Sequence, residues 1–504
     1  MSAETRLAAL PQEALTRLRR GVEKESLRVR PDGGLALTPH PAPLGSALTH
    51  PSITTDFSES QLELITGVHP TAAGCLQELT EIHQVVYRAI GDEMLWCASM
   101  PCGLTADDAI PLGRYGTSNV GRAKTVYRQG LAHRYGRRMQ AISGIHYNFS
   151  VPGTPSNDQY FALIRNFRRH SWLLLYLFGA SPAVCSTFVA GRPHELEQLN
   201  EHTHYLPYAT SLRMGRLGYR SDAQSSLAVS YNSLASYSAP LQEAMTRPYP
   251  PYEAIGVRTG DKYHQLATSL LQIENEFYGT IRPKRVIRPG ERPLHALRER
   301  GVEYVEVRLM DIDPFCPIGI GAPTFHFLDV FLLHCFVNES APDTPDELAE
   351  IGRNKQLVAA RGREPGLTLN RSGAETALAT WGAQVLAQCM PIAAALDGAN
   401  ETTVYSEAIE HAVAMLDDPS LTPSARVLAA MAHDHENSYV RFVLAQSIAH
   451  RNTILALPPS ADVADAYARL ARDSATKQRD IEAADRLSFE DYLAHYLAPE
   501  SLNV

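Results

Sequence analysis

The sequence has few cysteines, and none of them stands in a pattern that holds zinc. Seven cysteines are scattered over 504 residues, and no C-x-x-C pair or Cys/His spacing occurs among them. An odd number of scattered cysteines also argues against a disulfide framework of the secreted kind. We therefore expect reduced core cysteines in a cytoplasmic protein.

Positive charge is also scarce, which excludes one class of partner. Lys and Arg number 46 against 55 Asp and Glu, a net charge of −9, and no long basic cluster occurs, so we expect no nucleic-acid partner. The first 20 residues lack a long apolar run and a cleavage site, which favours an amphipathic helix over a signal peptide. The uncharged run 171–191 is interrupted by Pro182, so we expect a buried helix of about three turns there and no membrane partner.

Features that would divide the chain are absent as well. No internal repeat, low-complexity stretch or convincing linker occurs, so we expect a single domain over residues 1–504. A Walker P-loop and a kinase signature are also missing, so any nucleotide would have to be held by metals and cationic side chains.

The most informative stretch is Gly21 to Arg30, GVEKESLRVR. Its alternation predicts a strand that carries Glu23 and Glu25 on one face. Two neighbouring carboxylates repel each other in a protected setting unless a cation lies between them. Carboxylate oxygens favour Mg²⁺ or Mn²⁺. An isolated Glu-x-Glu is usually a solvated strand face, but this pattern recurs along the chain.

Four more segments read as strands, and two of them repeat the separation of polar from apolar side chains. Residues 144–151 alternate around His146 and Asn148, and residues 302–309 alternate around Glu306 and Arg308. The other two candidates are Gln61 to Thr66 and the segment LLQIENEFYGTIRPKRV. We expect a largely antiparallel sheet with helices on its apolar face and a cavity on its polar face. The metal-binding side chains predicted to meet there are Glu23, Glu25, Glu63, His146 and Glu306.

Such a cluster suits roughly two or three Mg²⁺ or Mn²⁺ ions better than Zn²⁺. It could activate water for hydrolysis or bridge nucleotide phosphates for phosphoryl transfer. Arg308 could contact a transferring phosphoryl group or could only neutralise nearby carboxylates. Arg282, Lys284 and Arg285 could bind phosphates or be ordinary surface cations. The residues alone leave these alternatives open.

Helical patterns account for most of the remainder. They cover residues 71–91, 123–138 and 159–177, and they dominate the chain after about residue 324. Region 181–263 is rich in loops. Further helix starts are predicted at Thr344, Thr422 and Ser488.

The chain closely resembles the proteobacterial type of glutamate–cysteine ligase. The matching segments include GVEKESLRV, ITTDFSESQLELIT, RYGTSNVGRAKTVYRQGLAHRYG, ISGIHYNFSVP, YLPYATSLRMGRLGY, LQIENEFYGTIRPKRV and GVEYVEVR, in this order over about residues 20–370. The last third matches more loosely, and the segment after Pro152 is shorter than in other members of the family.

The resemblance implies a glutamine-synthetase-like α+β fold. A curved antiparallel sheet would form an active-site funnel backed by helices (about residues 20–370), followed by a helical C-terminal part (about 371–504). It implies ATP-dependent phosphorylation of the γ-carboxylate of L-glutamate, attack by the amino group of L-cysteine, and release of γ-glutamylcysteine, ADP and phosphate. This is the first step of glutathione synthesis. It further implies Mg²⁺ or Mn²⁺ and feedback inhibition by glutathione, and it leaves the nucleotide-binding residues unassigned.

The resemblance also assigns roles to residues. It implies metal binding by Glu23, Glu25, Asp56, Glu63, His146 and Glu306. Arg308 would stabilise the transferring phosphoryl group, and Arg213 would bind a substrate carboxylate. The pocket for the cysteine side chain would be Phe57, Tyr127, Leu131, Tyr219 and Tyr278. The alternatives are another glutamate–amine ligase, a metal-binding regulator without catalysis, and a metal-dependent hydrolase.

Overall fold

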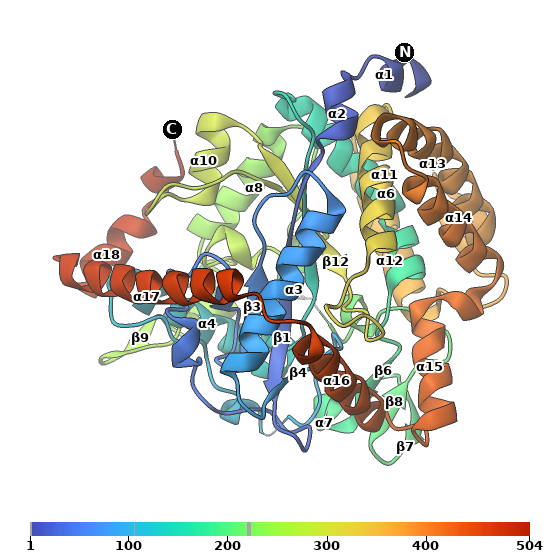
Figure 1. Cartoon of the computed structure of the whole chain (residues 1–504). Coiled ribbons are helices and arrows are strands. Elements are labelled where there is room, and N and C mark those ends of the chain that lie inside the picture. Colours follow the sequence, from blue (N-terminus) through green and yellow to red (C-terminus); the bar gives the residue numbers. More distant parts are fainter. Residues whose placement is uncertain (1–2, 105, 219–222, 504) are drawn as a thin grey trace.

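A computed structural model describes residues 3–104, 106–218 and 223–503. Within these residues the main sheet has seven strands in the order β11-β12-β5-β1-β3-β2, with β4 paired to the end of β1 (Figure 1). Every neighbouring pair is antiparallel, as the sequence predicts. The strands are β1 (Arg19–Val29), β2 (Ile53–Thr55), β3 (Gln61–Ile65), β4 (Met94–Leu95), β5 (Ile145–Ser150), β11 (Ile281–Lys284) and β12 (Tyr304–Met310).

The register of β1 brings the predicted polar side chains to one face. Glu23 lies opposite His146 on β5, and Glu25 lies opposite Glu63 on β3. Because successive side chains of a strand point to opposite faces, Val22 enters the core on the other side, where it is fully buried. The alternation in GVEKESLRVR therefore fixes which face carries the charges.

Helices α3 (Ala72–Ala89) and α6 (Asn157–Phe178) pack on the apolar face of the sheet, and α11 (Ala322–Val337) packs on both helices and reaches the sheet where Phe325 meets Tyr147 of β5. Helix α6 begins with a capping box, in which Ser156 and Gln159 each accept a hydrogen bond from the backbone N–H of the other. Helix α11 is apolar on nearly all sides because α3, α6, α13 and α14 surround it.

One buried ion pair ties α11 to the sheet. Arg20 of β1 donates to Asp329 of α11 at 2.7 Å, and Tyr147 of β5 donates to the same carboxylate at 2.8 Å. The side chains of Arg20 and Asp329 are only 2% and 0% exposed. Removing one partner of such a pair leaves a buried charge, at a cost of about 3–5 kcal/mol.

The chain after residue 340 is largely helical, as predicted. Thr344, Thr422 and Ser488 cap helix N-termini through their side-chain oxygens. Helices α13 and α14 pack beside α11, whereas α17 contacts α3 and lies at the left of the view, near α4 (Figure 1). The helices are α12 (Pro345–Arg361), α13 (Leu378–Asn400), α14 (Val404–Asp417), α15 (Pro423–Asp434), α16 (Tyr439–Ala456), α17 (Ala461–Ala484) and α18 (Phe489–Tyr496).

The loop-rich region contains more regular structure than expected, including the small sheet β6-β8-β7 and helix α8. The uncharged run 171–191 begins as the buried last turns of α6, which ends at Phe178, so the expected buried helix is present but shorter than three turns, and the run continues into β6 and α7. No described helix is both long and apolar enough to span a bilayer.

The other elements are α1 (Ala3–Ala8), α2 (Gln12–Thr16), α4 (Asn119–Tyr135), α5 (Arg137–Gln140), β6 (Ala183–Cys185), α7 (Ser186–Val189), β7 (Glu197–Asn200), β8 (Thr203–Tyr205), α8 (Leu234–Thr246), α9 (Pro250–Glu253), β9 (Arg258–Thr259), β10 (Lys262–Tyr263), α10 (Pro293–Arg300), β13 (Thr368–Arg371) and β14 (Ala374–Ala377).

The expectation that all cysteines are reduced is also contradicted. Cys102 and Cys185 form a disulfide across 83 residues, with their Cα atoms 5.3 Å apart. The loop after β4 meets β6 only in the folded chain, so sequence spacing gives no sign of this pair. The other five cysteines are free, and four of them are buried.

Candidate active site

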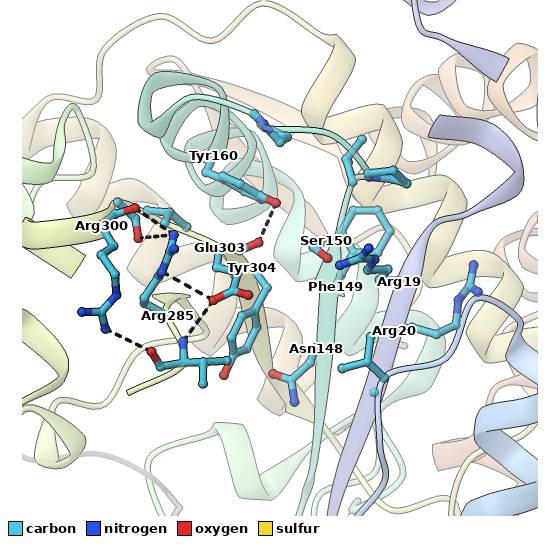
Figure 2. Close-up of a pocket in the computed structure, with 18 of the residues that line it drawn as sticks. Arg19, Arg20, Asn148, Phe149, Ser150, Tyr160, Arg285, Arg300, Glu303 and Tyr304 are labelled. Carbon is cyan, nitrogen blue, oxygen red and sulfur yellow. Dashed lines mark hydrogen bonds and ion pairs between the residues drawn. The ribbon is translucent and has the colours of Figure 1, made fainter. Parts of the chain in front are cut away.

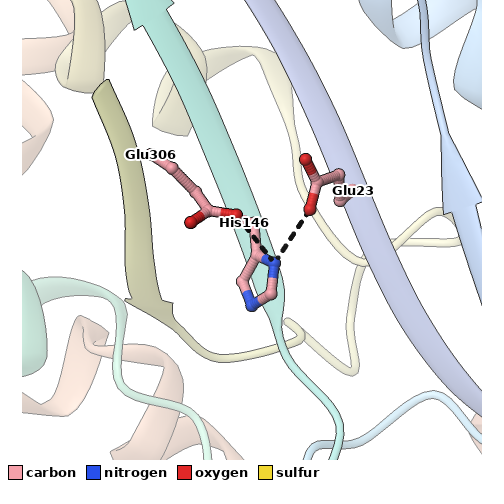
Figure 3. A group of neighbouring side chains, drawn as sticks. All are labelled: Glu23, His146 and Glu306. Atoms are coloured by element: carbon pink, nitrogen blue, oxygen red, sulfur yellow. Dashed lines mark hydrogen bonds and ion pairs between the residues drawn. The ribbon is translucent and has the colours of Figure 1, made fainter. Parts of the chain in front are cut away.

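Three neighbouring strands bring Glu23, His146 and Glu306 together (Figure 3). The Nδ1 of His146 lies 3.1 Å from Glu23 Oε2 and 3.7 Å from Glu306 Oε1. One potential ligand atom from each of these residues lies within 4.8 Å of the other two. This group, the strand triad, is the centre of the candidate site.

A second set of carboxylates continues the triad across β1. Glu25 Oε1 lies 3.6 Å from His146 Nε2, and Glu63 faces Glu25 from β3. Burial, with Asp56 nearby, raises the pKa of Glu25 to about 8. Burial and the charges of Glu23 and Asp56 raise the pKa of Glu63 well above its usual range. These carboxylates repel one another without a cation.

Glu306 has the opposite electrostatic environment. Its burial disfavours the charged form, but Lys284 at 3.3 Å and Arg308 at 3.2 Å hold its pKa well below the ordinary value. The second carboxylate oxygen, Oε2, is buried and has no hydrogen-bond partner among the described residues. A buried carboxylate oxygen without a donor fits a metal ligand, because carboxylates and one imidazole are a donor set for Mg²⁺ or Mn²⁺.

A cavity of about 430 Å³ opens over these side chains, and most of the predicted site residues line it. They are the whole predicted metal set (Glu23, Glu25, Asp56, Glu63, His146 and Glu306), four of the predicted substrate-binding residues (Phe57, Tyr127, Leu131 and Tyr278) and the predicted catalytic residue, Arg308. Tyr127 and Leu131 lie one turn apart on α4, so both face the cavity. Gln140 donates to the hydroxyl of Tyr278 at 2.7 Å and fixes that ring.

One predicted substrate-binding residue, Arg213, stands apart from the cavity wall. Arg213 is 2% exposed, donates to the carbonyl of Arg308 at 3.0 Å, and lies 3.7 Å from Asp311. It is not among the described residues that line the cavity. Its role in binding a substrate carboxylate stays a prediction. Tyr219 lies outside the described residues.

The cavity also has walls that the sequence analysis did not assign. Lys124 and Arg128 extend the face of α4 that carries Tyr127, so helical spacing alone could have found them. Tyr492 and Tyr496 of α18 also line the cavity, and their rings stack at 5.8 Å. No local signal links these residues to strands more than 180 positions away.

A larger cavity of about 910 Å³ adjoins the first, and Glu23 lines both. Figure 2 shows Arg285, Arg300 and Tyr304 on one side of it, and Arg19, Asn148 and Ser150 on the other. Val68 and Val286 also line it and are 72% and 64% exposed, more than any other large apolar side chain among the described residues. Cationic and apolar groups thus surround one space beside the strand triad.

Comparison with known proteins identifies the relatives of this chain. A family model described as glutamate–cysteine ligase matches residues 6–358. A glutamate–cysteine ligase from Pseudomonas entomophila is 49% identical over 95% of this chain and 93% of that protein. One from Alcanivorax borkumensis is 47% identical over 96% of each.

The chain belongs to the glutamate–cysteine ligase family. As a member it catalyses the ATP-dependent ligation that forms γ-glutamylcysteine in glutathione biosynthesis. The crystal structure of a Francisella tularensis glutamate–cysteine ligase in complex with AMP superimposes with a TM-score of 0.91 at 35% identity, covering 96% of this chain and 98% of that one. A bifunctional glutathione synthetase from Pasteurella multocida gives a TM-score of 0.71 at 26% identity, covering 93% of this chain and 57% of that one.

Proposed function

We propose that the 430 Å³ cavity binds L-glutamate and L-cysteine and that the 910 Å³ cavity binds ATP. The observation that carries this proposal is the position of Glu23, which belongs to the strand triad and lines both cavities. A phosphoryl group that passes from ATP to glutamate has to cross from one cavity to the other, and the triad lies at that junction.

Two groups of side chains would hold divalent cations, Mg²⁺ or Mn²⁺. The strand triad is one group, and Glu25, Asp56 and Glu63 form the other. The unpartnered Oε2 of Glu306 supports the first, and the raised pKa values of Glu25 and Glu63 support the second, because a cation would replace the protons there. When bound, such ions neutralise the phosphate and carboxylate charges that must approach one another.

Cationic side chains would stabilise the phosphoryl transfer. An oxygen of the γ-carboxylate of glutamate attacks the γ-phosphorus of ATP, and the bond to the ADP oxygen breaks. Negative charge spreads over the transferring group. Arg308, Lys284 and Arg282 all line the amino-acid cavity beside Glu306, where they can balance this charge.

The second step forms the amide bond. The amino nitrogen of cysteine attacks the acyl carbon of γ-glutamyl phosphate, the carbon–oxygen bond to the phosphate breaks, inorganic phosphate leaves, and the amine releases a proton. Phe57, Tyr127, Leu131 and Tyr278 would surround the thiol, since sulfur makes favourable contacts with aromatic rings. Tyr219 would join this pocket.

The larger cavity suits a nucleotide in two ways. Arg19, Arg285 and Arg300 line it as candidate partners for phosphate oxygens. The exposed side chains of Val68 and Val286 can cover the faces of an adenine base, which would remove apolar surface from water.

The proposal extends to regulation, location and domain structure. Glutathione contains the γ-glutamylcysteine unit, so it would compete with glutamate for the smaller cavity. Inhibition by glutathione that high glutamate concentrations fail to relieve would contradict this.

We place the enzyme in the cytoplasm, where ATP is supplied. We propose a single domain over residues 1–504 because one apolar cluster contains side chains from Ala14 to Leu502.

The function is tested by incubating the purified protein with ATP, Mg²⁺, glutamate and cysteine and measuring product masses. γ-Glutamylcysteine formed together with one ADP per product is the expected result. ATP cleavage without a ligated product would instead indicate a hydrolase. A preference for another amine over cysteine would indicate a different glutamate–amine ligase.

A further inference from the structure

Asp56 is the one member of the second carboxylate group that does not lie on a strand. It directly follows β2, whereas Glu25 and Glu63 lie on β1 and β3. Within the described part of the chain, no hydrogen bond or ion pair reaches the carboxylate of Asp56. The position of this carboxylate therefore depends on what holds the backbone of Asp56.

The backbone of Asp56 is held at both of its polar groups. Its N–H donates to the carbonyl of Gln61 at 3.1 Å, across the turn between β2 and β3. Its carbonyl accepts from the hydroxyl of Tyr115 at 2.8 Å and from the Nε of Arg128. The same hydroxyl donates to the carbonyl of Thr55 at 2.7 Å and accepts from the side chain of Thr55 at 2.9 Å. One hydroxyl thus joins the end of β2 to the residue that carries the carboxylate.

Tyr115 is buried behind the cavity wall. Its side chain is 1% exposed, and it is not among the described residues that line the 430 Å³ cavity. Gly113 leaves room for the hydroxyl, because a Cβ at that position would lie 2.9 Å from the hydroxyl oxygen. Burial raises the pKa of Tyr115, so the hydroxyl keeps its proton and remains a donor. Tyr115 can therefore act on the site only through the residues that it holds.

The ring of Tyr115 has partners of its own. The Cζ of Arg128 and the Nζ of Lys124, both on α4, lie 4.4 Å and 5.2 Å from the ring centroid. Both cations also interact electrostatically with Glu63. Because the ring and the hydroxyl have different partners, removal of the hydroxyl alone leaves the two cations in place.

We propose that Tyr115 is a positioning residue for a divalent cation, an inference that rests on the proposed function. By donating to the backbone of Asp56, it holds that carboxylate beside Glu25 and Glu63. Without the hydroxyl, the carbonyl of Asp56 keeps only Arg128, a long side chain from a separate helix, and the carboxylate can turn away from the other two. Loss of such an outer partner of a metal ligand typically lowers metal affinity roughly 10- to 100-fold.

The test measures metal binding directly, without turnover. Tyr115→Phe keeps the ring and removes the hydroxyl. Free Mn²⁺ is followed by electron paramagnetic resonance while the substrate-free protein is titrated with Mn²⁺. We expect the dissociation constant of one class of Mn²⁺ sites to rise about 10-fold, whereas the strand triad keeps its affinity. Identical Mn²⁺ binding by the variant and the wild type would overturn the proposal.

A double-mutant cycle shows whether Tyr115 acts through Asp56. Asp56→Asn removes the charged ligand itself, so adding Tyr115→Phe to it should weaken Mn²⁺ binding no further. Equal effects of Tyr115→Phe with and without Asp56→Asn would contradict the proposal, because independent sites add. Gly113→Ala gives a second reading, since its methyl group crowds the hydroxyl while Tyr115 stays in place. It should weaken the same Mn²⁺ site, and full affinity in this variant would also count against the proposal.

Tyr439→Phe is the matched control. Tyr439 is also 1% exposed, and its hydroxyl donates to the carbonyl of Met100 at 2.9 Å. Both phenylalanine variants lose a buried hydroxyl donor, so urea unfolding should show similar losses of stability, but only Tyr115→Phe should weaken Mn²⁺ binding. An equal loss of Mn²⁺ affinity in Tyr439→Phe would refute the proposal. Wild-type protein that binds Mn²⁺ but forms no γ-glutamylcysteine would instead refute the proposed function.

Discussion

Replacement of Glu306 by glutamine tests the strand triad most directly. Glu306→Gln keeps the shape of a side chain that is 1% exposed and removes its charge. In the wild type this carboxylate meets Lys284, Arg308 and His146 within 3.7 Å. The variant leaves these groups without their shared anion and deprives the proposed metal site of a charged ligand.

The expected loss follows from the burial of the carboxylate. Removing one member of a buried charge cluster costs about 3–5 kcal/mol. If that cost falls on the transition state, kcat/KM falls roughly 10²- to 10⁴-fold, since 1.36 kcal/mol is tenfold. Lys284 and Arg308 are 29% and 22% exposed, so water can solvate them in the free protein, and we expect much less of the cost in folding stability.

The assay is γ-glutamylcysteine formation across a Mg²⁺ titration, together with urea unfolding of the metal-free protein. We expect the variant to remain folded and to need more Mg²⁺ for its residual activity. The control is Glu243→Gln, which removes an exposed carboxylate from α8 that pairs with Arg247 on the same helix. Near-normal turnover of Glu306→Gln at limiting Mg²⁺ would refute the assignment of this residue to the metal centre.

Three further outcomes follow from other parts of the structure. Burial and Asp56 raise the pKa of Glu25 to about 8, so protonation of Glu25 stabilises the folded protein fully below pH ~4.5, and this stabilisation is lost as the pH rises through 8. The Tm of the metal-free protein should therefore fall between these pH values, and Mg²⁺ should make the fall smaller. A Tm that does not change with pH in EDTA would contradict the burial argument. Asp485 accepts a hydrogen bond from the backbone N–H of Asn119 at the start of α4, so Asp485→Ala should cost about 1 kcal/mol in urea unfolding. It should also raise the cysteine KM, because α4 carries side chains of the cavity wall. An unchanged KM would mean that α4 keeps its position without this hydrogen bond. Asp329→Asn should cost about 3–5 kcal/mol in urea unfolding, because it leaves the buried charge of Arg20 unpaired, and a loss below 1 kcal/mol would contradict this. The KM values of glutamate and cysteine should stay unchanged, because Arg20 is not among the described residues that line their proposed cavity.

The sequence predicts the charged face of the sheet well because the relevant information is local. Alternation in a strand determines which side chains share a face, so GVEKESLRVR places Glu23 and Glu25 together before any partner strand is known. The polar faces around His146 and Glu306 join the same face of the sheet once these strands pair with β1 and with each other. The structure brings them together as this argument expects.

The remaining features depend on contacts that no local pattern encodes. The periodicity of α18 marks an apolar face but not its neighbour, so nothing in it points Tyr492 and Tyr496 toward the cavity. The motif around Arg213 does not reveal that the guanidinium turns toward Asp311. The pairing of Cys102 with Cys185 likewise depends on how β6 packs against the loop after β4.

Positive charge is distributed unevenly over the acidic cluster, so the carboxylates of the strand triad and those of Glu25 and Glu63 differ in their pKa values. Lys284 and Arg308 keep Glu306 ionised, so the triad side is charged before any cation arrives. Glu25 and Glu63 face each other and lie near Asp56, and their pKa values are raised. A metal ion binds only the ionised carboxylate, so occupancy of this second group requires the loss of protons. If both groups hold cations as proposed, the strand triad would offer an ionised carboxylate at once, whereas Glu25 and Glu63 would have to lose protons when their cation binds.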